Sequence, residues 1–108
     1  MSKIIATILL LFSIHVGVSQ NRFQEVFSSK TRPLKENIRI YATDSFGNKG
    51  HLPVSIVKGK TDGPVFTIVA GVHGFEYPPI IATQELMQEI KTEELSGTII
   101  IIPIANTA

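Results

Sequence analysis

Two segments of the chain alternate apolar and polar residues with the two-residue period of half-buried β-strands. Every second residue is apolar in Ile38, Ile40 and Ala42, and again in Leu52, Val54 and Ile56. The sequence DSFGNKG lies between these segments and is rich in residues that form turns. The pattern therefore predicts an antiparallel hairpin within residues 37–59.

Two later segments are apolar without alternation. Residues 65–70 follow a turn sequence, KTDGP, and residues 98–104 read TIIIIPI, with Pro103 stopping the run. A continuous apolar run is typical of a strand that is covered on both faces. We therefore expect two strands here, and we expect residues 65–70 to form a buried central strand.

A helix is predicted between these two strands, over residues 80–92. Pro78 or Pro79 suits its first turn, where a missing N–H breaks no helical hydrogen bond. The residues expected to face the core are Ala82, Leu86 and Ile90, with Thr83 and Met87 beside them, whereas Gln84, Glu85, Gln88 and Lys91 are expected to face away. Gly97 is well placed to terminate this helix.

Strand, helix and strand together form a βαβ unit, in which the two strands are parallel. Their carboxyl ends then lie at the same edge of the sheet, so His73 and Asn106 are expected on one side. The predicted fold class is α/β, with an N-terminal hairpin followed by a βαβ unit in a mixed sheet.

Composition narrows the range of functions. The chain has 108 residues, is 44% hydrophobic and carries a formal charge of +1, which is typical of a globular protein. It has no basic run, so we expect no nucleic-acid partner. The chain has no cysteine, which leaves His, Asp and Glu as its strong metal ligands.

The first 36 residues are expected to lie outside the catalytic part of the chain. Lys3 precedes an apolar stretch that ends near Val18, and small residues follow, as in a secretory signal peptide over residues 1–19. This stretch is too short to span a bilayer, so we expect export to the periplasm or the exterior, without a stable membrane anchor after cleavage. Residues 20–36 contain Pro33 and show no period, which indicates an arm on the domain surface.

The sequence GVHGFE follows the strand at residues 65–70 and holds the candidate chemistry. Ligand-binding groups of open α/β sheets gather at the carboxyl ends of the strands. Gly71 and Gly74 leave room around His73, and Glu76 follows three residues later. An imidazole and a carboxylate at this spacing suit zinc, although a His in a strand-to-helix loop is more often a hydrogen-bonded structural residue. A phosphate-binding loop is disfavoured because no complete glycine motif is present.

Residues 50–107 resemble the N-terminal part of the succinylglutamate desuccinylase and aspartoacylase family, zinc-dependent hydrolases related to the zinc carboxypeptidases. The resemblance is carried by the strand, the G-x-H-G-x-E loop, the YPP helix start and the IPxAN strand end. It implies that His73 and Glu76 are two of three protein ligands of one zinc ion. Family members often have Asp or Asn in place of Phe75, a position that shapes the pocket and binds no metal.

The resemblance further implies that the third zinc ligand, the general base and the carboxylate-binding arginines lie beyond Ala108. Residues 37–108 are then the N-terminal part of a catalytic domain, an incomplete zinc-carboxypeptidase-like sheet that is inactive alone. Neither His51 nor His15 is a convincing third ligand. The implied reaction is hydrolysis of an amide or ester bond in a small molecule or peptide. A non-catalytic secreted α/β binding domain is the alternative, and Asn106 and Tyr77 are weaker candidates for the site.

Overall fold

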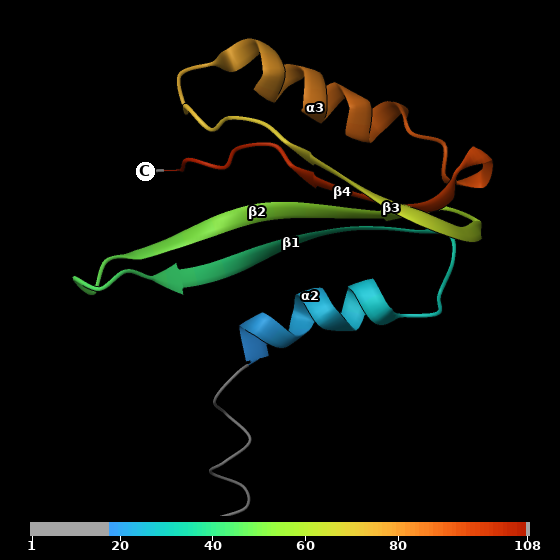
Figure 1. Cartoon of the computed structure of the whole chain (residues 1–108), viewed down its shortest axis with the longest axis horizontal. Helices are drawn as coiled ribbons and strands as arrows, with labels where there is room; N and C mark the ends of the chain where they lie inside the picture. The colour runs from blue at the N-terminus through green and yellow to red at the C-terminus, as the bar shows by residue number, and fades with distance from the viewer. Residues whose placement is uncertain (1–17, 108) are drawn as a thin grey trace, which may run out of the picture.

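The computed structural model describes the backbone of residues 18–107 and the side chains of residues 22–107. A four-stranded sheet, in the order β1-β2-β4-β3, separates helix α2 on one face from helix α3 on the other (Figure 1). The elements along the chain are α2 (Val18–Ser28), β1 (Leu34–Thr43), β2 (Lys49–Lys58), β3 (Thr61–Val69), α3 (Tyr77–Glu89), the 3₁₀ helix η1 (Thr92–Glu94) and β4 (Ser96–Ile102).

The pairing of the strands confirms the predicted mixed sheet. β1 and β2 form the antiparallel hairpin, with Ile38 opposite Val54. β3 and β4 are parallel and are connected through α3, as the βαβ prediction required. β4 also pairs antiparallel with β2, which joins the hairpin to the βαβ unit in one sheet.

The main core lies between α2 and the sheet. Val26 of α2 packs in a cluster of buried side chains from three strands: Ile38, Val54, Ile56 and Ile100. Residues 20–36, expected to be a surface arm without a period, therefore contain most of a packed helix and the first residues of β1. Among the described side chains of α2, Phe23 and Val26 belong to this core, and two residues three apart give a weak apolar signal.

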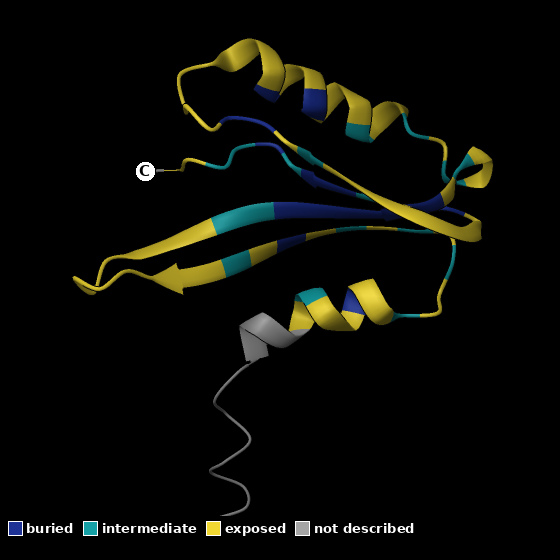
Figure 2. Ribbon diagram, in the orientation of Figure 1, coloured by how far each residue is buried: buried dark blue, intermediate teal, exposed yellow. Residues whose placement is uncertain are grey.

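Strand β3 is not the buried central strand that its apolar run predicted. It lies at the edge of the sheet, and the side chains of Val65 and Phe66 are 52% and 63% exposed. Figure 2 shows β3 mostly exposed, next to the buried strand β4. The apolar run predicts a strand, but it does not specify which strands pair with it or whether a helix covers it. The central positions belong to β2 and β4.

Helix α3 has proline in its first turn, as predicted, but it spans Tyr77–Glu89 and not residues 80–92, and its inward face differs from the prediction. Its buried residues are Ile80 and Thr83, whereas Ala82 is exposed. Gln84 and Gln88, which were expected to face away, line a cleft of about 360 Å³ between α3 and the hairpin. The buried Ile80 and Thr83 lie three residues apart, so the inward face passes one position after Ala82, the residue from which the predicted stripe was counted.

Gly97 does not terminate α3, which ends at Glu89 with Ile90 as its cap. Gly97 lies in β4 with φ +98°, and a Cβ atom there would be 2.2 Å from the carbonyl oxygen of Pro64. The glycine therefore permits close approach of the β3 and β4 backbones, because a side chain would clash in this left-handed conformation.

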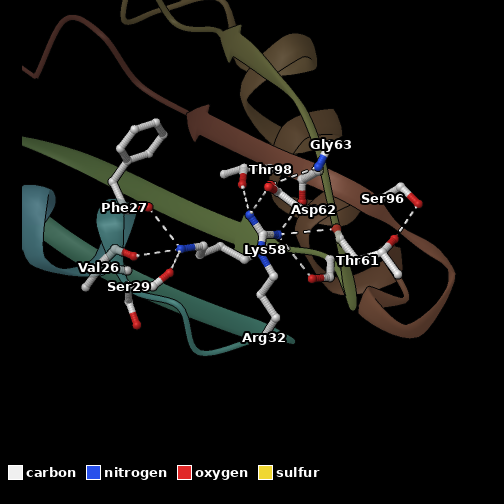
Figure 3. Close-up of polar contacts among 12 residues, drawn as sticks. Val26, Phe27, Ser29, Arg32, Lys58, Thr61, Asp62, Gly63, Ser96 and Thr98 are labelled. Atoms are coloured by element: carbon white, nitrogen blue, oxygen red, sulfur yellow. Dashed lines mark hydrogen bonds and ion pairs between the residues drawn. The ribbon is translucent and has the colours of Figure 1, made fainter.

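Lys58 anchors α2 to the sheet (Figure 3). Its side chain is fully buried, and its Nζ atom donates hydrogen bonds to the carbonyl oxygens of Val26, Phe27 and Ser29. These carbonyls lie at the end of α2, where helical partners are missing and a cation is favoured. Burial, together with the nearby Arg32 guanidinium, lowers the pKa of Lys58. The backbone carbonyls offset part of the free-energy cost of burying this charge.

Arg32 adds a second connection next to Lys58. Its Nη1 atom donates to the carbonyl oxygens of Gly59 and Gly97, at 3.2 and 3.1 Å, and its Nη2 atom lies 3.2 Å from a carboxylate oxygen of Asp62. The guanidinium thus joins the segment after α2 to the end of β2 and the start of β4. Together with Lys58, it makes residues 26–32 an integral part of the fold.

The tip of the hairpin is held by the carboxylate of Asp44. It accepts hydrogen bonds from the backbone N–H groups of Phe46 and Asn48 and from the Asn48 side chain. The Asn48 side chain and these N–H groups lower the pKa of Asp44. The turn is thus stabilised by the ionised form of the carboxyl group.

Acidification should loosen this turn. The stabilisation is complete above the ordinary aspartate pKa of about 3.9 and is lost as the pH falls through the lowered pKa of the folded state. The shift of the Asn48 backbone amide, followed by NMR, should therefore titrate below pH 3.9. The Asp44→Asn variant should show no such titration, and an identical titration in this variant would contradict the assignment.

Candidate metal site

The loop after β3 is fixed by backbone hydrogen bonds to the segment that follows β4. Ala70 donates to the carbonyl of Ile102, and the N–H groups of Ala105 and Asn106 donate to the carbonyls of Ala70 and Gly71, each at 2.9 Å. The two chain segments therefore run together at the carboxyl edge of β3 and β4. His73 and Asn106 emerge at this edge, as the βαβ prediction required.

His73 and Glu76 are brought into direct contact. The Nδ1 atom of His73 lies 2.8 Å from the Oε1 atom of Glu76, and the two side chains are 63% and 47% exposed. Glu76 occupies the N-cap position of α3, but its carboxylate makes no capping hydrogen bond. It turns toward the imidazole instead, so one nitrogen donor and one oxygen donor lie together at the surface.

A cavity of about 520 Å³ lies beside this pair. His73, Phe75 and Tyr77 line it from the loop and the start of α3, and Ile104, Asn106 and Thr107 line it from the segment after β4. Asn106 and Tyr77, the weaker candidates from the sequence, thus both reach the site region. Ile104 and Thr107 were missed, and their position just after an apolar strand at the same edge was the signal that could have identified them.

His51 does not join the pair. It lies in β2, and its ring packs near Tyr41 with 6.1 Å between ring centroids. Its backbone carbonyl accepts a hydrogen bond from the Thr107 hydroxyl at 2.9 Å. This contact connects the hairpin to the wall of the cavity. His15 lies outside the described residues.

The donor pair suits zinc in its chemistry, because zinc binds mixed imidazole and carboxylate ligands. Among the side chains of residues 22–107, however, no three His, Cys, Asp or Glu residues cluster in a way that could hold a metal. A catalytic zinc site usually has three protein ligands. The His73 and Glu76 pair could supply two of the three donors that such a site needs.

Replacement of Gly71 by alanine should displace the loop that carries His73. Gly71 has φ +63°, and an added Cβ atom would lie 2.9 Å from the Cα atom of Ile104. We expect the variant to lose about 1–3 kcal/mol of unfolding free energy. Chemical denaturation measures this loss. Gly50→Ala is the control, since nothing lies within 4 Å of its added Cβ atom. Equal stability of the two variants would contradict the strain assigned to Gly71.

The described fold matches the aspartoacylase-type, zinc-carboxypeptidase-like α/β fold in part. A succinylglutamate desuccinylase/aspartoacylase from Rhodobacter sphaeroides superposes with a TM-score of 0.59 and 26% identity, over 73% of this chain and 25% of that one. An aspartoacylase family protein from Mesorhizobium loti gives a TM-score of 0.61 and 25% identity, over 71% of this chain and 24% of that one.

Sequence comparison agrees with this structural likeness. Residues 62–108 match the family described as the succinylglutamate desuccinylase/aspartoacylase catalytic domain, so the resemblance predicted from the loop is confirmed. The chain is also 39% identical over 56 residues to the N-alpha-acetyl-L-2,4-diaminobutyric acid deacetylase of Halomonas elongata. This match covers 52% of the chain and 16% of that relative, so the chain spans about a sixth of its length.

Proposed function

We propose that this chain contributes part of the active site of a zinc-dependent hydrolase that cleaves an amide bond in an N-acyl amino acid. One observation carries the proposal: the segment that matches a deacylase catalytic domain places His73 and Glu76 2.8 Å apart at the ligand-binding edge of the sheet. The deacetylase relative supports amide cleavage in a small molecule. No specific observation favours a non-catalytic binding domain.

In this proposal His73 and Glu76 hold the metal. When bound, zinc supplies a water of lowered pKa and polarises the substrate carbonyl. The loop backbone, fixed by Ala105 and Asn106, keeps the two ligands oriented. The cavity beside them accepts the substrate next to the reacting centre. We propose that a third ligand and the general base come from further sequence, because the solved relatives are about four times longer than the matched part.

Hydrolysis of N-acetyl amino acids tests the proposal. The protein expressed from the complete reading frame should release acetate and a free amino acid, and dialysis against a chelator should abolish this activity. Zinc should restore it. Release of acetate that is unaffected by chelation would contradict the zinc mechanism, and the absence of any N-acyl substrate would contradict the amide-hydrolase assignment.

We also propose that residues 1–19 direct export. Most of this segment lies outside the described residues, and its last two residues lie in the first turn of α2. Within residues 18–107, the structure has no helix long and apolar enough to cross a membrane. N-terminal sequencing of the mature protein should begin near Gln20. An intact Met1 in a membrane fraction would contradict cleavage.

A further inference from the structure

Two large aromatic side chains line the cavity beside His73 without being buried. Phe75 is 75% exposed and Tyr77 is 66% exposed. Phe75 stacks on the imidazole of His73, with 5.8 Å between ring centroids and 9° between ring planes. Ile104 adds an aliphatic surface from the segment after β4. A single exposed ring is common on protein surfaces and indicates no function. Several apolar side chains that line one concave site are typical of a ligand-binding site.

The cavity lining is also poor in charge. His73 is the only titratable group besides the Tyr77 hydroxyl among its described lining residues, and the others are apolar, amide, hydroxyl or glycine groups. The substrate in the relative's name, N-alpha-acetyl-L-2,4-diaminobutyric acid, has a second amino group. A site for such a cation would favour a free carboxylate in the lining; none lines the described cavity, and Glu76 beside it contacts His73 and is assigned to the metal.

We infer that the cavity selects a substrate with an aromatic or bulky apolar group next to the scissile amide bond. The inference rests on the proposed function and specifies its substrate class. Phe75 and Tyr77 offer ring faces against which an aromatic group can stack, and such pairs add to the gain from burying apolar area. Because Phe75 lies directly on His73, the bound group is held adjacent to the proposed metal ligand.

Substrate comparison with the protein from the complete reading frame tests this inference. N-acetyl-L-phenylalanine places the ring on the amino-acid side of the bond, and N-benzoylglycine places it on the acyl side. N-acetylglycine and N-acetyl-L-aspartate serve as references without a ring. We expect kcat/KM for one of the two aromatic substrates to exceed that for N-acetylglycine by about tenfold or more. The aromatic substrate with the higher kcat/KM shows whether the cavity binds the amino-acid side or the acyl side of the amide.

Phe75→Asp should reduce this preference about tenfold while leaving the zinc content unchanged. Phe46→Asp is the matched control, because Phe46 is 89% exposed at the hairpin tip and does not line the cavity. An equal kcat/KM for all substrates would overturn the inference and leave amide hydrolysis in place. A lower melting temperature of Phe75→Asp with an unchanged preference would also overturn it, because the ring would then serve packing.

A binding measurement tests the preference of the cavity independently of hydrolysis. If no substrate is cleaved, the proposed function fails, and isothermal titration with L-phenylalanine and L-aspartate still tests the cavity. Tighter binding of L-phenylalanine, lost in Phe75→Asp, would support the inference. Equal or absent binding of both amino acids would overturn it.

Discussion

His73→Ala and Glu76→Ala should each strongly reduce the zinc content of the protein expressed from the complete reading frame. Each substitution removes one of the two donors that the structure places 2.8 Å apart. Loss of a group that merely orients a zinc ligand already costs 10- to 100-fold in metal affinity or activity, so loss of a ligand should cost about 100-fold or more. Elemental analysis measures the zinc, and N-acetyl amino acid hydrolysis measures the activity.

The chain offers a matched control for each substitution. His51→Ala removes an exposed imidazole from β2, and Glu85→Ala removes an exposed carboxylate from the middle of α3. Neither side chain lines the cavity beside His73. Both controls should keep full zinc content. Equal zinc content in all four variants and the wild type would reject His73 and Glu76 as ligands.

Lys58→Met should be the substitution with the largest effect on stability. Methionine retains the length and apolar stem of the side chain, but it donates no hydrogen bond to the carbonyls of Val26, Phe27 and Ser29. The Val26 carbonyl keeps the Ser29 N–H as a donor. Leaving a buried carbonyl without a partner costs about 1–3 kcal/mol for each group that water cannot reach. We expect a loss of about 2–3 kcal/mol of unfolding free energy, measured by urea denaturation.

Hydrogen exchange can localise this effect. The amides of α2 should exchange faster in Lys58→Met, because this lysine joins the end of α2 to β2, whereas the amides of β4 should change less. Lys60→Met is the control, since Lys60 is 64% exposed and its nearest acid, Glu93, lies 3.7 Å away. An exposed pair of this kind contributes at most about 1 kcal/mol. A control variant as unstable as Lys58→Met would refute the anchoring role.

The elements could be predicted from sequence where a local pattern determines them. The alternation in residues 38–42 and 52–56 and the turn between them predicted the hairpin, and the proline pair predicted the start of α3. These signals depend on neighbours along the chain. The position of His73 and Asn106 at one edge followed from the geometry of a βαβ unit, which is recognised from three elements that follow one another along the chain.

The order of the strands could not be predicted in the same way. The runs at residues 65–70 and 98–104 are both apolar, yet β4 is central and β3 lies at the edge. The difference arises because β2 pairs with β4, a choice made between segments far apart in sequence. The buried Lys58 was missed for a related reason: its three acceptors are carbonyls, which any residue supplies, so no sequence pattern marks them.

The pairing of the His73 loop with the segment after β4 has a consequence for the order of folding. The carbonyls of Ala70 and Gly71 find their partners only in Ala105 and Asn106, a whole helix and strand later in synthesis. During translation His73 and Glu76 therefore leave the ribosome well before the backbone that orients them. The donor pair should become fixed late, after β4 has docked between β2 and β3, so metal capture would follow folding of the sheet and not nucleate it.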